Sequence, residues 1–212
     1  MLKINKKLNM EESLNNLPPA PNQPSYAQKI GEFVWEIVKI VVIALVIIVP
    51  VRMYIIQPFI VEGASMEPNF YDGQYLIVDE LSYLLGTPKR GEVVIFHPPS
   101  DKDVYYIKRV IGLPGERVLI ENGSIYIFNN SKPTGTRLNE EEYSLDHKIV
   151  KSEKDDLTLK DDEYYLIGDN RTNSLDSRRI GPIKIDFIKG RAWVRAFPFD
   201  DFSIFKAPNY NF

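Results

Sequence analysis

A dense run of β-branched and other apolar residues at positions 33–51, apolar throughout from Ile40, constrains this chain more than any other feature. A helix of about 20 residues, rising about 1.5 Å per residue, spans the roughly 30 Å hydrocarbon layer of a bilayer. We therefore predict one transmembrane helix at residues 32–54, which Pro50 kinks or ends near the far face. A cleavable signal peptide fits less well, because a long polar segment precedes the run. A buried globular helix also fits less well, because the run lacks polar alternation.

The segment before the apolar run predicts a disordered tail and an orientation. Residues 1–31 are rich in Asn, Pro, Lys and Glu, with four prolines within residues 17–24, a composition that cannot bury enough apolar surface to fold. Basic residues lie mainly on the amino side of the run: Lys3, Lys6, Lys7, Lys29 and Lys39, against Arg52 on the other side. The positive-inside rule then predicts a single-pass protein of the plasma membrane, with a cytoplasmic N-terminus and residues 55–212 outside.

Charge and cysteine content exclude several classes of site. The 212 residues carry a formal net charge of −3, so no basic footprint indicates a nucleic-acid partner. No cysteine is present, which removes disulfides, thiolate nucleophiles and cysteine metal ligands. The two histidines, His97 and His147, lie far apart in sequence.

Beyond the apolar run, the sequence predicts a mostly β, extracytoplasmic sheet domain. Short runs rich in β-branched and aromatic residues are separated by turn signals that contain Gly, Pro, Asn or Asp. The predicted strands lie at residues 75–79, 92–96, 105–111, 117–120, 124–128, 163–167 and 192–197. Residues 129–162 are polar and charged, so we expect a small inserted cap within about residues 117–162.

Aromatic residues gather close to the C-terminus: Trp193, Phe197, Phe199, Phe202 and Phe205. They could let the domain rest on the outer leaflet of a bilayer. Packing of core strands is the favoured interpretation.

Ser65 is the best candidate nucleophile. Gly63 and Ala64 precede it and leave the backbone unobstructed, so a substrate carbonyl could approach and a main-chain N–H could face it. An ordinary turn serine is the alternative for an isolated Gly-Ala-Ser sequence. The position of Ser65 shortly after a membrane helix favours the functional interpretation.

A nucleophilic serine needs a base, and histidine is poorly supplied here. We expect His97, in a His-Pro-Pro sequence, and His147, in the charged insertion, to be surface or turn residues and not the base. On a strand, Tyr106, Lys108 and Val110 share one face, so the Lys108 amine could lie against an apolar wall. Burial disfavours the ammonium form and can lower a lysine pKa by several units, which would make Lys108 a general base. A strand lysine with its amine in water is the open alternative.

A third polar stretch, residues 168–178, reads Gly-Asp-Asn-Arg-Thr-Asn-Ser-Leu-Asp-Ser-Arg. The Ser174 hydroxyl could hold the lysine amine in place, and Asp176 with Arg178 could brace the loop as an ion pair. By itself the stretch could also be a polar surface loop or a cation site. Its carboxylates are too few for a metal site, and no histidine lies close by.

Four stretches, in this order behind one apolar segment, closely resemble bacterial type I signal peptidase (leader peptidase), a family of serine/lysine-dyad proteases. They are Gly-Ala-Ser-Met-Glu-Pro-Asn at 63–69, Lys-Arg-Gly-Glu-Val-Val-Ile-Phe at 89–96, Tyr-Ile-Lys-Arg-Val-Ile-Gly-Leu-Pro-Gly at 106–115, and the stretch at 168–178. The resemblance covers about residues 35–198 and leaves out most of the insertion.

The resemblance implies a role for each matching residue. Ser65 would be the nucleophile, Lys108 the general base, and Ser174 the residue that orients the lysine. The structural supports would be two ion pairs, Asp176 with Arg178 and Asp169 with Arg109. Some members carry a hydroxyl residue two positions before the nucleophile, where this chain has Gly63. The oxyanion would then rest on the Ser65 N–H and a backbone group at Gly63.

The resemblance also implies the substrate and the surroundings. The protein would be a membrane-bound endopeptidase that removes signal peptides from exported preproteins near the export translocon, through an acyl-enzyme and without a metal or other cofactor. Shallow pockets would admit only small side chains one and three residues before the cut. The implied lining residues are Phe59, Val61, Met66, Tyr106 and Ile107.

Two other functions are open to a chain of this kind. One is a catalytically inactive, membrane-anchored binder of signal peptides or surface-assembly partners, which an intact set of Ser65, Lys108 and Ser174 disfavours. The other is a self-cleaving repressor of the same serine/lysine clan. Such repressors need a DNA-binding module in front, where this chain has a tail and an apolar helix.

Overall fold

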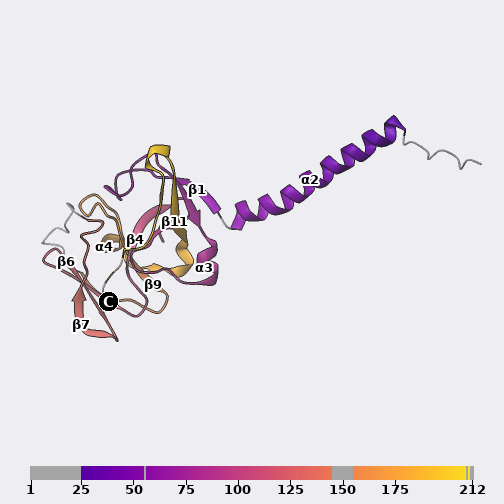
Figure 1. Cartoon of the computed structure of the whole chain (residues 1–212). Helices are drawn as coiled ribbons and strands as arrows, with labels where there is room; N and C mark the ends of the chain where they lie inside the picture. The colour runs from indigo at the N-terminus through magenta and orange to yellow at the C-terminus, as the bar shows by residue number, and fades with distance from the viewer. Residues whose placement is uncertain (1–24, 55, 145–154, 209, 211–212) are drawn as a thin grey trace, which may run out of the picture. The chain divides into compact units, whose positions relative to one another are not determined.

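A computed structural model of the chain describes residues 25–54, 56–144, 155–208 and 210 (Figure 1). The chain divides into two compact units, residues 1–48 and residues 49–212. The prediction of a disordered tail falls mostly on residues 1–24, outside the described residues, and His147 lies outside them too.

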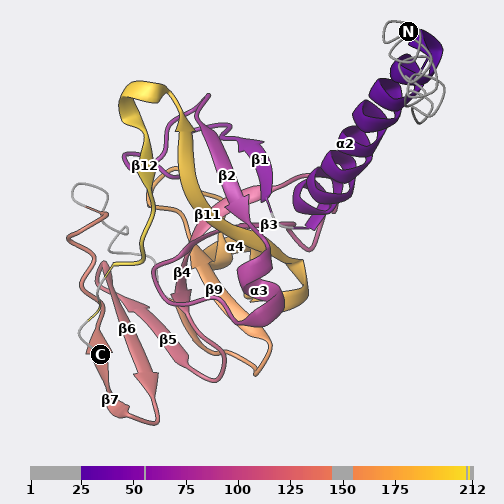
Figure 2. The same ribbon diagram turned by 45° about the vertical axis from the view of Figure 1, so that its right-hand side comes forward.

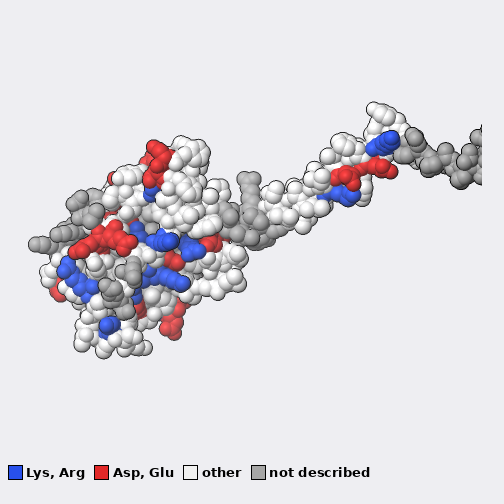
Figure 3. All heavy atoms as spheres, in the orientation of Figure 1, with Lys and Arg blue, Asp and Glu red and all other residues white. Residues whose placement is uncertain are grey.

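The first unit contains one long helix, α2 (Tyr26–Tyr54), which continues into the second unit. It begins six residues before the predicted segment at 32–54. Figure 3 shows the charged side chains of α2 gathered towards one end of the helix. In the part of the chain that the structure describes, no helix combines the length and the apolar character that a membrane crossing requires, so the predicted transmembrane helix is not confirmed. Glu32, Glu36 and Lys39 interrupt the apolar character of its first half.

The second unit is mostly β, as predicted. Its large sheet has the strand order β1-β2-β11-β3-β4-β9-β10, with β12 paired to β11, and all neighbours are antiparallel. The strands are β1 (Ile56–Ile60), β2 (Tyr75–Asp79), β3 (Val93–Phe96), β4 (Tyr106–Gly112), β9 (Glu163–Ile167), β10 (Ile183–Lys184), β11 (Ile188–Phe197) and β12 (Ser203–Ile204). Short helices join them: α3 (Leu81–Leu85), α4 (Ser177–Ile180), η1 (Ile185–Phe187) and η2 (Phe199–Asp201).

Side-chain alternation along the strands gives this sheet two packed faces. On β3, Val93 and Ile95 join a core cluster with Phe70, whereas Val94 and Phe96 join a separate cluster. Successive side chains of a strand point to opposite faces, and here both faces are covered by apolar residues. This is why the β3 sequence reads as a continuous apolar run instead of an alternating one.

A second, four-stranded sheet occupies the predicted insertion. Its order is β7-β6-β5-β8, and Figure 2 shows β5, β6 and β7 together at one end of the domain. The strands are β5 (Arg117–Glu121), β6 (Ser124–Asn129), β7 (Lys132–Arg137) and β8 (Asp155–Thr158). Buried residues of β5 and β6 pack against Ile111 of β4 and against Tyr165 and Ile167 of β9, so the inserted sheet shares a core with the strand that carries Lys108.

The aromatic run near the C-terminus corrects our favoured interpretation of core packing. Phe199 is 82% exposed and Phe202 is 59% exposed, and Trp193 and Phe197 are also exposed. Only Phe205 packs inward, with its ring 4.6 Å from that of Phe70. The reason is local: the 3-10 turn η2 and the short strand β12 leave Phe199 and Phe202 on a projecting connection.

Candidate active site

Ser65 lies in the turn between β1 and β2. Backbone bonds close the base of this turn, from Val61 N–H to Gln74 O (2.9 Å) and from Gly73 N–H to Val61 O (2.9 Å). Gly63 has a φ of +80°, a conformation that favours glycine because it has no Cβ. The turn therefore presents Ser65 from a closed loop that contains two glycines of positive φ, Gly63 and Gly73.

Lys108 lies on β4, and its amine reaches the Ser65 hydroxyl. The Nζ is 2.8 Å from Ser65 Oγ and donates to Ile107 O at 2.7 Å. The lysine is only 3% exposed. Burial lowers the pKa of Lys108 to about 8, against the opposing attraction of Asp176 and Asp169. The amine is therefore buried beside the candidate nucleophile.

Two buried ion pairs surround this contact, both anticipated from the sequence. Asp169 Oδ1 and Oδ2 accept from Arg109 Nε (2.8 Å) and Nη2 (2.6 Å). Asp176 accepts from Arg178 Nε (2.8 Å) and Nη2 (2.7 Å), and its Oδ2 also accepts from Gly168 N–H (3.0 Å). Burial alone would raise the pKa of Asp176, but the bonds and charge of Arg178 outweigh it and lower that pKa. Each carboxylate is therefore paired with a guanidinium through two hydrogen bonds.

Two asparagines that the sequence analysis did not single out tie these parts together. Asn170 donates its side-chain amide to Ala64 O (3.0 Å) and its backbone N–H to Ser65 O (3.1 Å). Asn69 donates Nδ2 to Asp169 Oδ2 at 2.9 Å. The turn that carries Ser65 is thereby fixed to the loop that carries both buried aspartates. The sequence does show that an asparagine, Asn170, follows Asp169. It does not show which carbonyl the amide of Asn170 bonds.

Comparison with known proteins identifies the family. The family model for signal peptidase, peptidase S26, matches residues 34–197. Signal peptidase I of Bacillus licheniformis is 35% identical over 170 residues, covering 79% of this chain and 90% of that protein. Signal peptidase IB of Staphylococcus aureus (strain MRSA252) is 34% identical over 185 residues, covering 81% and 91%. A solved signal peptidase I of Enterococcus faecalis V583 is 28% identical and covers 50% of this chain and 97% of that structure, with a TM-score of 0.41.

The chain belongs to the signal peptidase family, peptidase S26. It is therefore a serine peptidase, and its remaining site residues can be compared with the expectations for a signal peptidase.

Ser174 is buried, but it does not hold the lysine amine by a hydrogen bond. Its Oγ lies close enough to Asp176 to help lower the pKa of that carboxyl, yet it forms no hydrogen bond of good geometry with any described residue. It packs against Gly168 instead. The role of Ser174 in orienting Lys108 stays a prediction.

The structure does not support Gly63 as a second oxyanion donor. Its N–H donates to Asp72 Oδ1 at 2.7 Å, so this group is already bonded. The Ser65 N–H has no hydrogen-bond partner among the described residues and is free to receive a substrate oxygen. The Gly63 N–H is thus not available to a substrate oxygen in this structure.

A groove of about 470 Å³ opens beside the Ser65–Lys108 contact. Four of the five predicted pocket residues line it: Phe59, Val61, Tyr106 and Ile107. Met66 is a correction, because it is 1% exposed and packs in the core with Phe70 and Leu76. Lining residues that were not predicted are Ile60, Glu62, Leu76, Ile95, Asp103, Val104, Tyr105 and Leu175.

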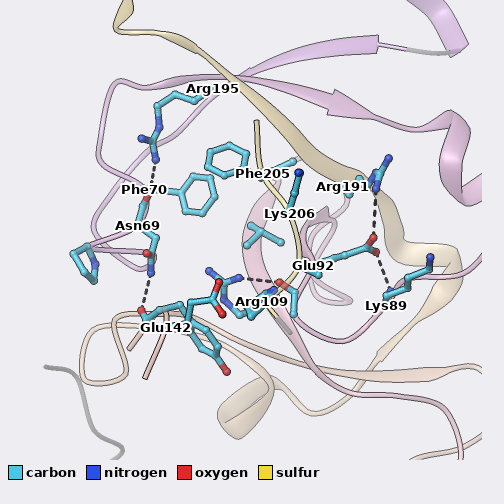
Figure 4. Close-up of a pocket in the computed structure, with 17 residues that line it drawn as sticks. Asn69, Phe70, Lys89, Glu92, Arg109, Glu142, Arg191, Arg195, Phe205 and Lys206 are labelled. Carbon is cyan, nitrogen blue, oxygen red and sulfur yellow. Dashed lines mark hydrogen bonds and ion pairs between the residues drawn. The ribbon is translucent and has the colours of Figure 1, made fainter. Parts of the chain in front are cut away.

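A second pocket, of about 570 Å³, lies elsewhere on the domain and shares no lining residue with the groove. Figure 4 shows Arg109, Asn69 and Phe70 among its lining residues, with Arg109 bonded to Gly91 O at 2.8 Å. Its basic lining residues are Lys89, Arg109, Arg191, Arg195 and Lys206. The pocket therefore reaches the supporting residues of the site but not the reacting pair.

The expectation for the histidines holds for the one that is described. His97 stacks on Tyr105 with ring centroids 4.1 Å apart, and its Nδ1 lies 3.0 Å from Val104 O. It makes no hydrogen bond to Ser65 within the described residues, so Lys108 is the base that the geometry offers.

Substitution of Gly168 by alanine should disturb the nucleophile without unfolding the domain. A Cβ at this position would lie 2.5 Å from Ser65 O and 2.2 Å from Ser174 Oγ. The hydroxyl can rotate, but the backbone carbonyl cannot, so the Ser65 turn must shift. Because a displacement of about 1 Å can cost roughly 10²-fold in rate, we expect a loss of that order in kcat/KM with a retained melting transition.

Gly31→Ala is the matched control, since a Cβ there meets nothing within 4 Å. Full activity of the Gly168→Ala variant would contradict the assigned packing. Turnover of a preprotein and thermal unfolding are the two measurements.

Proposed function

We propose that this chain is a membrane-anchored signal peptidase that removes signal peptides from exported preproteins, with Ser65 as nucleophile and Lys108 as general base. The single observation that carries the proposal is the 2.8 Å contact between Lys108 Nζ and Ser65 Oγ at a buried amine. The relatives named signal peptidase I support the same substrate class.

The proposed chemistry is acyl transfer. Uncharged Lys108 accepts the proton of the Ser65 hydroxyl while Ser65 Oγ attacks the carbonyl carbon of the cleaved bond. The Ser65 N–H stabilises the oxyanion, and the protonated lysine returns its proton to the leaving amine of the mature protein. A water molecule, deprotonated by Lys108, then hydrolyses the ester and releases the signal peptide.

The groove supports selection of an extended substrate. β1 lies at the edge of the large sheet, and the groove runs between residues 59–62 and residues 103–107. A preprotein segment that pairs with these edges would gain backbone hydrogen bonds, while small side chains enter the apolar part near Val61 and Ile107. Such pairing would place the cleaved bond beside Ser65.

The proposed anchor rests on the apolar part of α2. Large apolar side chains of residues 40–49 are exposed all round the helix, from 45% for Val49 to 67% for Val46. A helix that is apolar on every side belongs either in a protein core or in a bilayer, and no core covers this one within the described residues. Exposed Phe199 and Phe202 would let the domain rest on the same lipid surface.

The catalytic pair can be tested by substitution. Ser65→Ala should remove the covalent route and leave only background cleavage of a preprotein with an Ala-x-Ala site. Lys108→Ala should cost about 10²–10⁴-fold, the usual contribution of a general base. Lys108→Arg retains a charge but cannot give it up at physiological pH, so it should be equally inactive.

Binding of a signal peptide by the unsubstituted protein without any turnover would favour the inactive-binder alternative. Activity of either alanine variant near the wild-type rate would remove that residue from the mechanism.

The pH dependence of kcat/KM should report the lysine. The base must be uncharged, and burial lowers the pKa of Lys108 to about 8. Activity should therefore fall about tenfold per unit as pH drops below about 8, and it should level off above about 9. A lysine with its amine in water would leave the rate still rising at pH 10, and a flat profile between pH 6 and 9 would contradict a lysine base.

The anchor can be tested on the full chain. We expect it to remain with membranes after an alkaline wash, and Val42→Lys combined with Ile47→Lys should release it, because each buried charge costs about 2.5–3.5 kcal/mol at the centre of a bilayer helix. Phe199→Ser with Phe202→Ser is the control, since loss of a surface contact should not release an anchored chain. Release of the unsubstituted protein by the wash would contradict the anchor, and digestion of the domain by external protease would locate it outside.

A further inference from the structure

Two carboxylates line the substrate groove without any partner. Glu62 follows Val61 directly before the Ser65 turn, and Asp103 lies in the segment that leads into β4. Both are exposed. Within residues 56–144 and 155–208, neither carboxylate accepts a hydrogen bond or forms an ion pair. Their charges are therefore available to whatever occupies the groove.

Nearby basic groups do not neutralise them. Lys108 is the one basic residue among the described residues that line the groove, and it is buried and uncharged in its active form. Exposed Lys102 lies between Asp101 and Asp103 in sequence, so this segment keeps a net negative charge. The basic side chains gather instead around the second pocket (Figure 4). The groove is thus acidic at its exposed rim, and apart from Ser65 and Lys108 its other lining residues are apolar or aromatic.

We propose that Glu62 and Asp103 make this enzyme prefer preproteins with a basic side chain close to the cleaved bond, at positions that do not enter the apolar pocket. This inference rests on the proposed function. Side chains of an extended substrate alternate in direction, so residues one and three before the cut enter the pocket while residue two points elsewhere. A lysine or arginine two positions before the cut, or directly after the cut, can approach the carboxylates of Glu62 and Asp103.

The expected size of the effect follows from solvent exposure. An exposed ion pair changes an equilibrium by about two- to fivefold, so two carboxylates together give about tenfold between a basic and an acidic side chain. The effect must weaken with salt, because the screening length falls from about 10 Å at 0.1 M to about 3 Å at 1 M. Discrimination by shape or apolar contact would not respond to salt in this way.

The test compares three peptides that differ only in the residue two positions before the cut: Lys, Gln or Glu, with Ala at the neighbouring pocket positions. With the full-length enzyme at low ionic strength, kcat/KM should be about tenfold higher for the Lys peptide than for the Glu peptide. This ratio should approach one in Glu62→Gln with Asp103→Asn, and also in about 1 M salt. A second peptide series with the same change directly after the cut locates the preference.

Asp161→Asn is the matched control. Asp161 is exposed in the turn between β8 and β9 and does not line the groove, so its loss removes one charge while the Lys-to-Glu ratio stays unchanged. Equal rates for the Lys and Glu peptides, with normal cleavage of the Gln peptide, would overturn the charge preference and leave the proposed function intact. A ratio that persists in the double variant would also overturn it. If no peptide is cleaved at all, both proposals fail.

Discussion

The candidate active site depends on one lysine amine that the fold keeps out of water, 2.8 Å from a serine hydroxyl. Lowering the pKa of Lys108 from 10.5 to about 8 corresponds to roughly 3 kcal/mol of unfavourable free energy while the amine is charged. Because the folded pKa lies below the unfolded one, this destabilisation is fully present below pH 8 and disappears as pH rises towards 10.5. The surrounding core must offset it, and the shared packing of β4 with both sheets provides that core.

The buried ion pairs make this environment possible because they neutralise the acids nearest to the amine. Asp169 and Asp176 attract a charged lysine and would raise its pKa if they stood alone. Each is instead held by a guanidinium through two hydrogen bonds, from Arg109 and Arg178. Buried pairs add little net stability, but removal of one partner leaves an uncompensated charge. Here the two ion pairs fix the loops that carry the aspartates, and the guanidinium charges limit how far these aspartates raise the pKa of Lys108.

The sequence predicted what local patterns determine and missed what depends on long-range contacts. The positions of β2, β3, β4, β5, β6, β9 and β11 follow from residue type and turn signals, and the pairing of Ser65 with Lys108 follows from motif resemblance. The strands β1, β7, β8, β10 and β12 were missed, because they are short or polar and their partners lie elsewhere in the sequence. Asn170 was missed because its amide bonds Ala64 across more than a hundred residues. The prediction that Met66 lines the pocket was wrong, because an apolar residue after the nucleophile can face either the groove or the core. The conformation of the turn packs Met66 against Phe70 in the core. The bond from Gly63 to Asp72 depends on the closed shape of that turn.

Alternation along a single strand explains how the charges are distributed. Adjacent residues of β4 point to opposite faces, so Lys108 faces the groove and Arg109 faces the second pocket. Arg109 forms a buried ion pair with Asp169, and neither residue lines the groove. The ionisable group in the buried part of the groove, among the described residues, is then the Lys108 amine, which can lose its charge. Among the described residues that line the groove, the carboxylates are Glu62 and Asp103 at the exposed rim, where water screens their charge from Lys108 but a bound peptide displaces that water.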